Sequence, residues 1–137
     1  MKISYFSDDV AFRLKEKRKI SDWLKKAAAA EKKIVDNLTY VFVSDEKITD
    51  LNRKFLKHDY ATDILTFDSS EDDFIAGEMF ISVDTVKENA KYYSASFEIE
   101  ILRVILHGML HLCGYKDETE EEQKKFRELE EKYLLLF

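Results

Sequence analysis

The sequence predicts one α/β (α+β) domain, residues 1–137, in which a mixed sheet of about four strands packs with about five helices. Strand-like and helix-like patterns alternate through the first two thirds of the chain, and the last third contains helical patterns only. The 137 residues are 45% hydrophobic, which is enough for one buried core. No stretch approaches the roughly 18 uncharged apolar residues that a membrane helix requires.

Four short segments combine β-branched and aromatic residues, which favour strands. They are residues 2–6, 37–44, 62–67 and 77–83. In the second segment Val41, Phe42 and Val43 follow one another without a polar residue. Such runs are typical of strands covered on both faces, so we expect 37–44 to be a central strand.

Five segments repeat apolar residues at helical spacing, and most follow a residue that caps helices well. The expected N-caps are Ser21 for a helix over 21–33, Ser44 or Asp45, Asp84 or Thr85, Ser96, and the capping box of Thr119 and Glu122. A loop through residues 57–60 is expected between the second helix and the third strand.

Charge is distributed unevenly along the chain. The net charge of −6 argues against general nucleic-acid binding, but Lys and Arg are dense over residues 13–33. This basic segment is either a phosphate-binding face or the solvated surface of a helix. One cysteine, Cys113, excludes an intramolecular disulfide, and the amino terminus lacks the apolar core of a signal peptide. Both features fit a cytoplasmic protein without a membrane segment.

Residues 97–117 form the most apolar run of the chain and contain two of its three histidines. Residues four apart share one face of a helix, so His107 and His111 are expected side by side. Gly114 can take the left-handed conformation that ends a helix, which lets Asp117 turn back toward them. Zinc hydrolases with a third ligand use this spacing. The predicted metal ligands are therefore His107, His111 and Asp117.

The alternative interpretation of this helix is plain hydrophobic core. Two buried imidazoles without partners would cost roughly 1–3 kcal/mol each, and a shared metal ion would offset that cost. Cys113 lies about 200° around the helix from His111 and is interpreted as a small apolar residue. The residue after the first histidine is Gly108, where H-E-x-x-H proteases carry the glutamate that activates water. Another base or another reaction is therefore required.

Four motifs, in order and spacing, resemble the YbeY family of bacterial rRNA-maturation metalloproteins. They are LNRKF at 51–55, TDILTF at 62–67, GEMFIS at 77–82 and HGMLHLCGY at 107–115. The resemblance implies a zincin-like fold and one zinc ion per chain, normally held by three histidines. It also implies a cytoplasmic, single-strand-specific endoribonuclease that acts in 3′-end maturation of small-subunit rRNA and in ribosome quality control. The implied partners are rRNA and the small ribosomal subunit.

The chain departs from the family pattern at the end of its last motif. The family usually ends G-Y-D-H, whereas residues 114–117 read G-Y-K-D, so Asp117 occupies the place of the third histidine. A carboxylate is an acceptable zinc ligand. Asp117 is thus either the third ligand or the base of the reaction.

A second departure removes a positive charge, because Leu56 stands where the family usually has an arginine. A cation near the zinc would stabilise the charge that develops on a phosphate. Lys57 and His58, in the following loop, are the first candidates to replace it. The remaining candidates are Lys116 and Arg103. Asp63 either orients a ligand imidazole or caps its own loop. The predicted catalytic residues are Lys57, His58 and Asp63.

Two other functions remain open at this point. One is a different zinc-dependent hydrolase, such as a peptidase, which the ligand spacing allows and Gly108 disfavours. The other is a non-catalytic, zinc-stabilised module of ribosome assembly. Nothing in the sequence indicates an oligomeric state.

Overall fold

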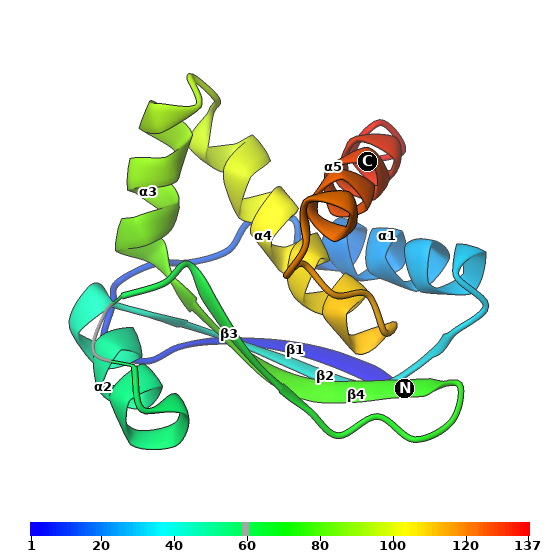
Figure 1. Ribbon diagram of the computed structural model, residues 1–137, viewed down its shortest axis with the longest axis horizontal. Helices are drawn as coiled ribbons and strands as arrows, with labels where there is room; N and C mark the ends of the chain where they lie inside the picture. Colours follow the sequence, from blue (N-terminus) through cyan, green and yellow to red (C-terminus); the bar gives the residue numbers. More distant parts are fainter. Residues whose placement is uncertain (59–60) are drawn as a thin grey trace.

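A computed structural model describes residues 1–58 and 61–137, and within these ranges it contains four strands and five helices in one domain (Figure 1). In chain order they are β1 (Lys2–Ser7), α1 (Lys17–Ala30), β2 (Ile34–Val43), α2 (Asp45–Leu56), β3 (Ile64–Asp68), β4 (Phe74–Ser82), α3 (Val83–Tyr92), α4 (Phe97–Leu112) and α5 (Glu120–Leu134). The predicted fold class is confirmed. No helix in the described ranges has the length and apolar character needed to span a bilayer.

The four strands form one mixed sheet with the order β1-β2-β4-β3. β1, β2 and β4 run parallel, and β3 pairs antiparallel with β4. β2 is therefore a central strand, as predicted, and β1 and β3 are the two edges of the sheet.

Helices α1, α4 and α5 lie over one face of the sheet, and α2 lies against the other (Figure 1). On the first face, Tyr40 and Phe42 of β2 belong to the main core, which α1, α4 and α5 also line. On the second face, Val43 forms a smaller core with Ile48 of α2 and Leu65 of β3. β2 is covered on both faces only near its carboxyl end, because Asn37 at its beginning is exposed.

Helix α4 lies close to the sheet because glycine occupies one contact position. A Cβ atom on Gly108 would lie 2.7 Å from Ile64 Cδ1 and 2.8 Å from Met79 Sδ. The Tyr40 hydroxyl donates a hydrogen bond of 2.8 Å to the carbonyl of Ile105, which also ties the helix to β2. This close packing sets the height of the carboxyl-terminal half of α4 above β3 and β4.

Two predicted helix starts were wrong. Helix α1 begins at Lys17, after Glu16 in a left-handed conformation, and not at Ser21. The Ser21 hydroxyl instead lies 2.9 Å from the Tyr5 hydroxyl, so a contact with β1 uses the side chain that was expected to cap the helix.

Helix α3 is capped by Ser82, whose hydroxyl accepts from the backbone N–H of Thr85 at 3.2 Å. The prediction had placed the cap at Asp84 or Thr85. The capping box of α5 is present as predicted. The predicted loop over 57–60 includes residues 59–60, which lie outside the described residues.

Candidate metal centre

Helix α4 and the turn after it bring three potential ligands together. His107 and His111 lie one turn apart, with ring centroids 4.7 Å from each other. Gly114 takes a φ of 105°, as predicted, and the backbone N–H of Tyr115 bonds to the Leu110 carbonyl at 3.2 Å. The chain therefore reverses at the end of the helix and returns Asp117 to the histidine face.

The three predicted ligands present one atom each to a common point. His107 Nε2 lies 3.1 Å from His111 Nε2 and 3.2 Å from Asp117 Oδ2, and His111 Nε2 lies 3.5 Å from the same oxygen. Two atoms bound to one zinc at about 2.0–2.1 Å, with a tetrahedral angle between them, lie about 3.3 Å apart. The spacing fits a tetrahedral ion, and this group could hold a metal ion.

The other nitrogen of each imidazole has its own hydrogen-bond partner. His107 Nδ1 lies 2.8 Å from Glu130 Oε2, and His111 Nδ1 lies 3.0 Å from the carbonyl oxygen of Tyr115. Each acceptor places the ring proton on Nδ1 and leaves Nε2 free for a metal. Both imidazoles are thus held in the tautomer that a metal ligand requires.

Glu130 was not among the predicted site residues. It is buried on α5, where it also lies 3.6 Å from Arg103 Nη1, and Arg103 Nε lies 3.3 Å from Glu100. A sequence signal existed, because Glu130 falls on the apolar face of α5 between Phe126 and Tyr133. A carboxylate at such a position is rarely buried without a partner.

Aromatic and amide side chains of α5 complete the surroundings of the ligands. The Phe126 ring stacks on His107, with centroids 4.2 Å apart, and lies 4.9 Å from His111. Gln123 Nε2 donates a hydrogen bond of 3.1 Å to the Asp117 carbonyl, which fixes the turn that carries the third predicted ligand.

The two histidines differ in electrostatics. Burial lowers the pKa of His107, but the hydrogen bond and charge of Glu130, with Asp63 and Asp117, outweigh it and leave that pKa raised. Burial and the neighbouring charge of His107 lower the pKa of His111. The acidic groups that raise the pKa of His107 would also attract a divalent cation.

A cleft of about 540 Å³ opens beside the three ligands, along edge strand β3. Its described lining includes the ligands, four β3 residues and the segment before β3, together with Leu56 and Lys116. Asp63 lies in this cleft, and burial raises its pKa, opposed by the charge of His107. A partly buried carboxyl group thus lies near the ligands without belonging to the ligand cluster.

The predicted catalytic residues are distributed differently from the ligands. Asp63 lines the cleft but is not the acceptor for either ring Nδ1 atom, because those acceptors are Glu130 and the Tyr115 carbonyl. The Thr62 hydroxyl donates a hydrogen bond of 3.4 Å to Asp63. Lys57 and His58 are exposed at the end of α2 and are not among the described residues that line the cleft.

The two other candidate cations, Lys116 and Arg103, differ in their surroundings. Lys116 lines the cleft, and Arg103 is held in ion pairs by Glu100 and Glu130. Cys113 ends α4 half-buried, and burial raises its pKa to about 12, so its thiol stays protonated.

Gly108 stands where the H-E-x-x-H proteases carry their glutamate, and it faces the sheet at close approach. A Cβ atom at this position would press on the ends of the Ile64 and Met79 side chains, which would have to shift. Glycine therefore suits the close packing between α4 and the sheet.

Known proteins are similar to this chain in sequence and in fold. The sequence model of the family described as "Endoribonuclease YbeY" matches residues 3–137. The chain belongs to the YbeY family. A relative named Endoribonuclease YbeY from Bacteroides thetaiotaomicron is 41% identical over 136 residues, covering 99% of each chain. Another of the same name from Cytophaga hutchinsonii is 44% identical over 135 residues, covering 98% of this chain and 94% of its own.

The structural comparison agrees. The solution structure of a protein from Thermotoga maritima superimposes with a TM-score of 0.68 at 31% identity, covering 97% of this chain and 87% of that one. Family membership covers the whole described domain, including the ligand turn.

Leu56 and Lys116 line the same cleft.

Proposed function

We propose that this protein is a zinc-dependent endoribonuclease that cuts single-stranded RNA in the cleft beside β3. One observation carries the proposal: three converging ligand atoms, with both imidazoles fixed in the metal-binding tautomer, lie in an open cleft of a YbeY-family chain. Two nitrogens and one oxygen at tetrahedral spacing suit zinc. A zinc ion bound there would lower the pKa of a bound water and stabilise charge on a phosphate oxygen.

Asp63 is the proposed general base. Its carboxylate lies in the cleft, and its pKa is raised by burial, which brings it closer to the working pH and makes it a better proton acceptor. It is not needed to orient His107, because Glu130 does so. In this role the Asp63 carboxylate takes the proton of the attacking group.

Lys116 is the proposed cation of the cleft. Among the described lining residues it is the one Lys or Arg, and it forms no ion pair or hydrogen bond within residues 1–58 and 61–137. Its ammonium group is therefore available to a phosphate oxygen next to the ligands. Lys57 and His58 follow Leu56, which lines the cleft, and are proposed to contact RNA beyond that end.

The proposed biological substrate is the 3′ region of small-subunit rRNA, cut during maturation and in ribosome quality control in the cytoplasm. Single-stranded RNA suits an open cleft at a sheet edge, since an unpaired strand can present one phosphate to the ligands. The family membership supports RNA as the substrate class.

Single-turnover cleavage of a single-stranded rRNA fragment by zinc-loaded protein tests the proposal. We expect cleavage that depends on zinc and is absent for casein, which serves as the peptidase control. Tight RNA binding without metal-dependent cleavage would instead favour the zinc-stabilised assembly module. Casein cleavage without RNA cleavage would favour the peptidase.

A further inference from the structure

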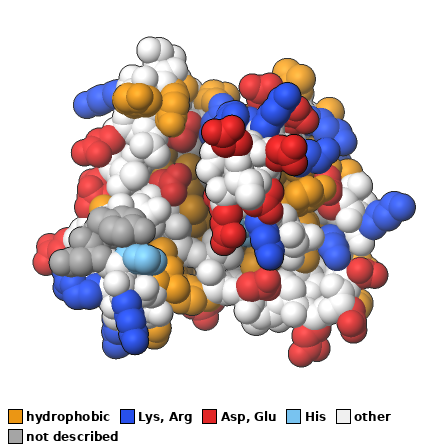
Figure 2. All heavy atoms as spheres, viewed as in Figure 1, with side chains coloured by type: hydrophobic (Ala, Val, Ile, Leu, Met, Phe, Trp, Pro, Cys, Tyr) orange, Lys and Arg blue, Asp and Glu red, His pale blue; other side chains and the backbone are white. Residues whose placement is uncertain are grey.

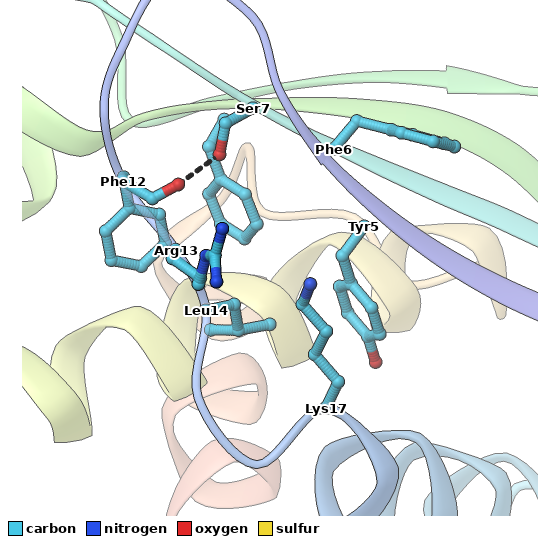
Figure 3. Close-up of a pocket in the computed structure, with 8 residues that line it drawn as sticks. Tyr5, Phe6, Ser7, Phe12, Arg13, Leu14 and Lys17 are labelled. Atoms are coloured by element: carbon cyan, nitrogen blue, oxygen red, sulfur yellow. Dashed lines mark hydrogen bonds between the residues drawn. The ribbon is translucent and has the colours of Figure 1, made fainter.

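A second pocket lies at the other edge of the sheet, beside β1. It has a volume of about 220 Å³ and is formed where β1, the loop before α1, the start of α1 and the end of β2 meet (Figure 3). Its lining residues are Tyr5, Phe6, Ser7, Phe12, Arg13, Leu14, Lys17 and Phe42. It is smaller than the pockets that hold drug-sized ligands, and it suits a group of the size of a phosphate.

Two cations and no acidic residue line this pocket. Figure 3 shows the Arg13 guanidinium and the Lys17 ammonium directed toward the same space between the loop and β1. Neither residue forms an ion pair with any described residue. Two positive charges that face one cavity repel each other, and a bound anion would offset that repulsion.

The acidic residues closest along the chain are engaged elsewhere. Asp8 pairs with Lys47 at 3.5 Å, Asp9 accepts from the backbone N–H of Ser44 at 2.9 Å, and Glu16 pairs with Lys19 at 3.8 Å. The fold therefore directs three carboxylates away from the pocket. None of the three forms an ion pair with Arg13 or Lys17.

Charges are distributed differently on another part of the surface. On the face in Figure 2, Lys and Arg side chains lie next to Asp and Glu side chains, as expected for a chain with 22 basic and 28 acidic residues. A cavity lined only by cations, aromatic rings and neutral groups is unusual on such an acidic protein.

The free edge of β1 adds main-chain donors. The backbone N–H of Asp8 bonds to the Phe42 carbonyl at 3.0 Å, so alternate residues of this parallel strand face β2. Tyr5 and Ser7, which line the pocket, consequently direct their N–H groups away from β2 and toward the open edge. Phe6, with 57% of its surface exposed, offers a ring beside the pocket on which a base can stack.

We propose that this pocket binds one phosphodiester of the RNA outside the cut segment, through Arg13 and Lys17. This inference rests on the proposed function, because it takes RNA as the substrate. The pocket and the metal cleft lie at opposite edges of the sheet, and the two edge strands are separated by three strand spacings, about 14 Å. The pocket would therefore hold a part of the strand other than the bond to be cut.

The test compares two double variants that remove the same charge. Arg13→Gln/Lys17→Gln empties the pocket of cations, and Lys25→Gln/Lys26→Gln removes two exposed lysines of α1 outside it. Binding of metal-free protein to RNA oligomers of about 4 and about 16 nucleotides is measured over a range of salt. Metal-free protein is used so that binding is read without cleavage.

For the long oligomer we expect the pocket variant to bind about ten- to hundredfold more weakly than the control variant. The slope of log affinity against log salt should fall by about 0.7, the value for one lost contact to a single strand. Zinc-dependent cleavage of the short oligomer should match the control. The charge-conserving Arg13→Lys/Lys17→Arg variant should recover most of the affinity, and thermal unfolding confirms that all variants fold.

Equal affinity and slope for the two double variants would overturn the inference and leave the proposed function intact. Equal competition by polyglutamate of matched charge would also overturn it, because the pocket would then recognise acidic protein. Absence of zinc-dependent cleavage by the wild type would remove the proposed function, and the salt slope would still decide whether the pocket binds phosphate.

Discussion

The two edges of the sheet carry opposite charge. The cleft at β3 contains Asp63, Asp68 and Asp117 against one lysine, Lys116. The pocket at β1 contains two cations and no acid. An acidic cleft attracts a divalent metal but repels an RNA phosphate, so a site that is good for zinc is poor for its own substrate. Positive charge at the far edge would resolve this conflict, because it attracts the strand without displacing the metal.

Removal of a metal ligand should have the largest effect and should affect only the β3 edge. With His111→Ala, we expect RNA cleavage to fall on the order of a thousandfold or more, because a bound metal contributes several kcal/mol to the transition state. Zinc content should fall well below one per chain, whereas Arg13→Gln/Lys17→Gln should keep its zinc. Elemental analysis and single-turnover kinetics measure both. Normal cleavage by zinc-free His111→Ala protein would place the reaction elsewhere.

Asp63→Asn should slow RNA cleavage without changing the zinc content of the protein. As general base, Asp63 contributes on the order of a hundredfold or more, so single-turnover cleavage should fall by that factor. Zinc content should not change, since Asp63 is not one of the three ligands. Cleavage at the wild-type rate would exclude Asp63 as the base.

The same variant should make metal-free protein more stable at neutral pH. Burial raises the pKa of Asp63 above its ordinary 3.8, so the folded state binds this proton more tightly than the unfolded state. Stability therefore falls as pH rises from 3.8 to the raised pKa and stays lowered above it. Asn removes that loss at pH 7 but not below pH 3.8, so the variant should exceed the wild type in stability only at the higher pH. Urea unfolding across pH measures the difference.

Glu130→Gln should weaken zinc binding about ten- to hundredfold, as expected when the charged acceptor behind a ligand histidine becomes a neutral amide. The matched control is Glu128→Gln, the same change at an exposed position of α5. Competition with a chelating dye measures the affinity of each variant. Equal affinities would mean that Glu130 supports folding alone and does not orient His107.

The smallest effect should come from the single cation of the β3 edge. Lys116→Gln should slow cleavage about tenfold, with the salt slope of RNA binding reduced by about 0.7 and zinc affinity unchanged. Lys124→Gln, an exposed lysine of α5, is the control. If both variants behave like the wild type, the phosphate charge at the cut bond is balanced without Lys116.

Local spacing explains what could be predicted. The strands, the helix with His107 and His111, the left-handed Gly114 and the capping box of α5 all depend on residues within a few positions of each other. The predictions failed where a distant contact decided the outcome. Ser21 lies inside α1 and pairs with the partly buried hydroxyl of Tyr5 in β1 instead of capping the helix.

The sequence by itself determined that two imidazoles share one helix face and that Asp117 returns to them, because helical periodicity and a glycine turn fix those positions. Tertiary structure alone decided that Glu130, 23 residues away, orients His107 and that Lys116 and not Lys57 lines the cleft. It also decided that Gly108 faces the sheet at close approach. It also placed Arg13 and Lys17 in one pocket and directed the nearby acids to other partners. Such pairings depend on how elements pack, and packing joins residues whose separation in sequence carries no periodic signal.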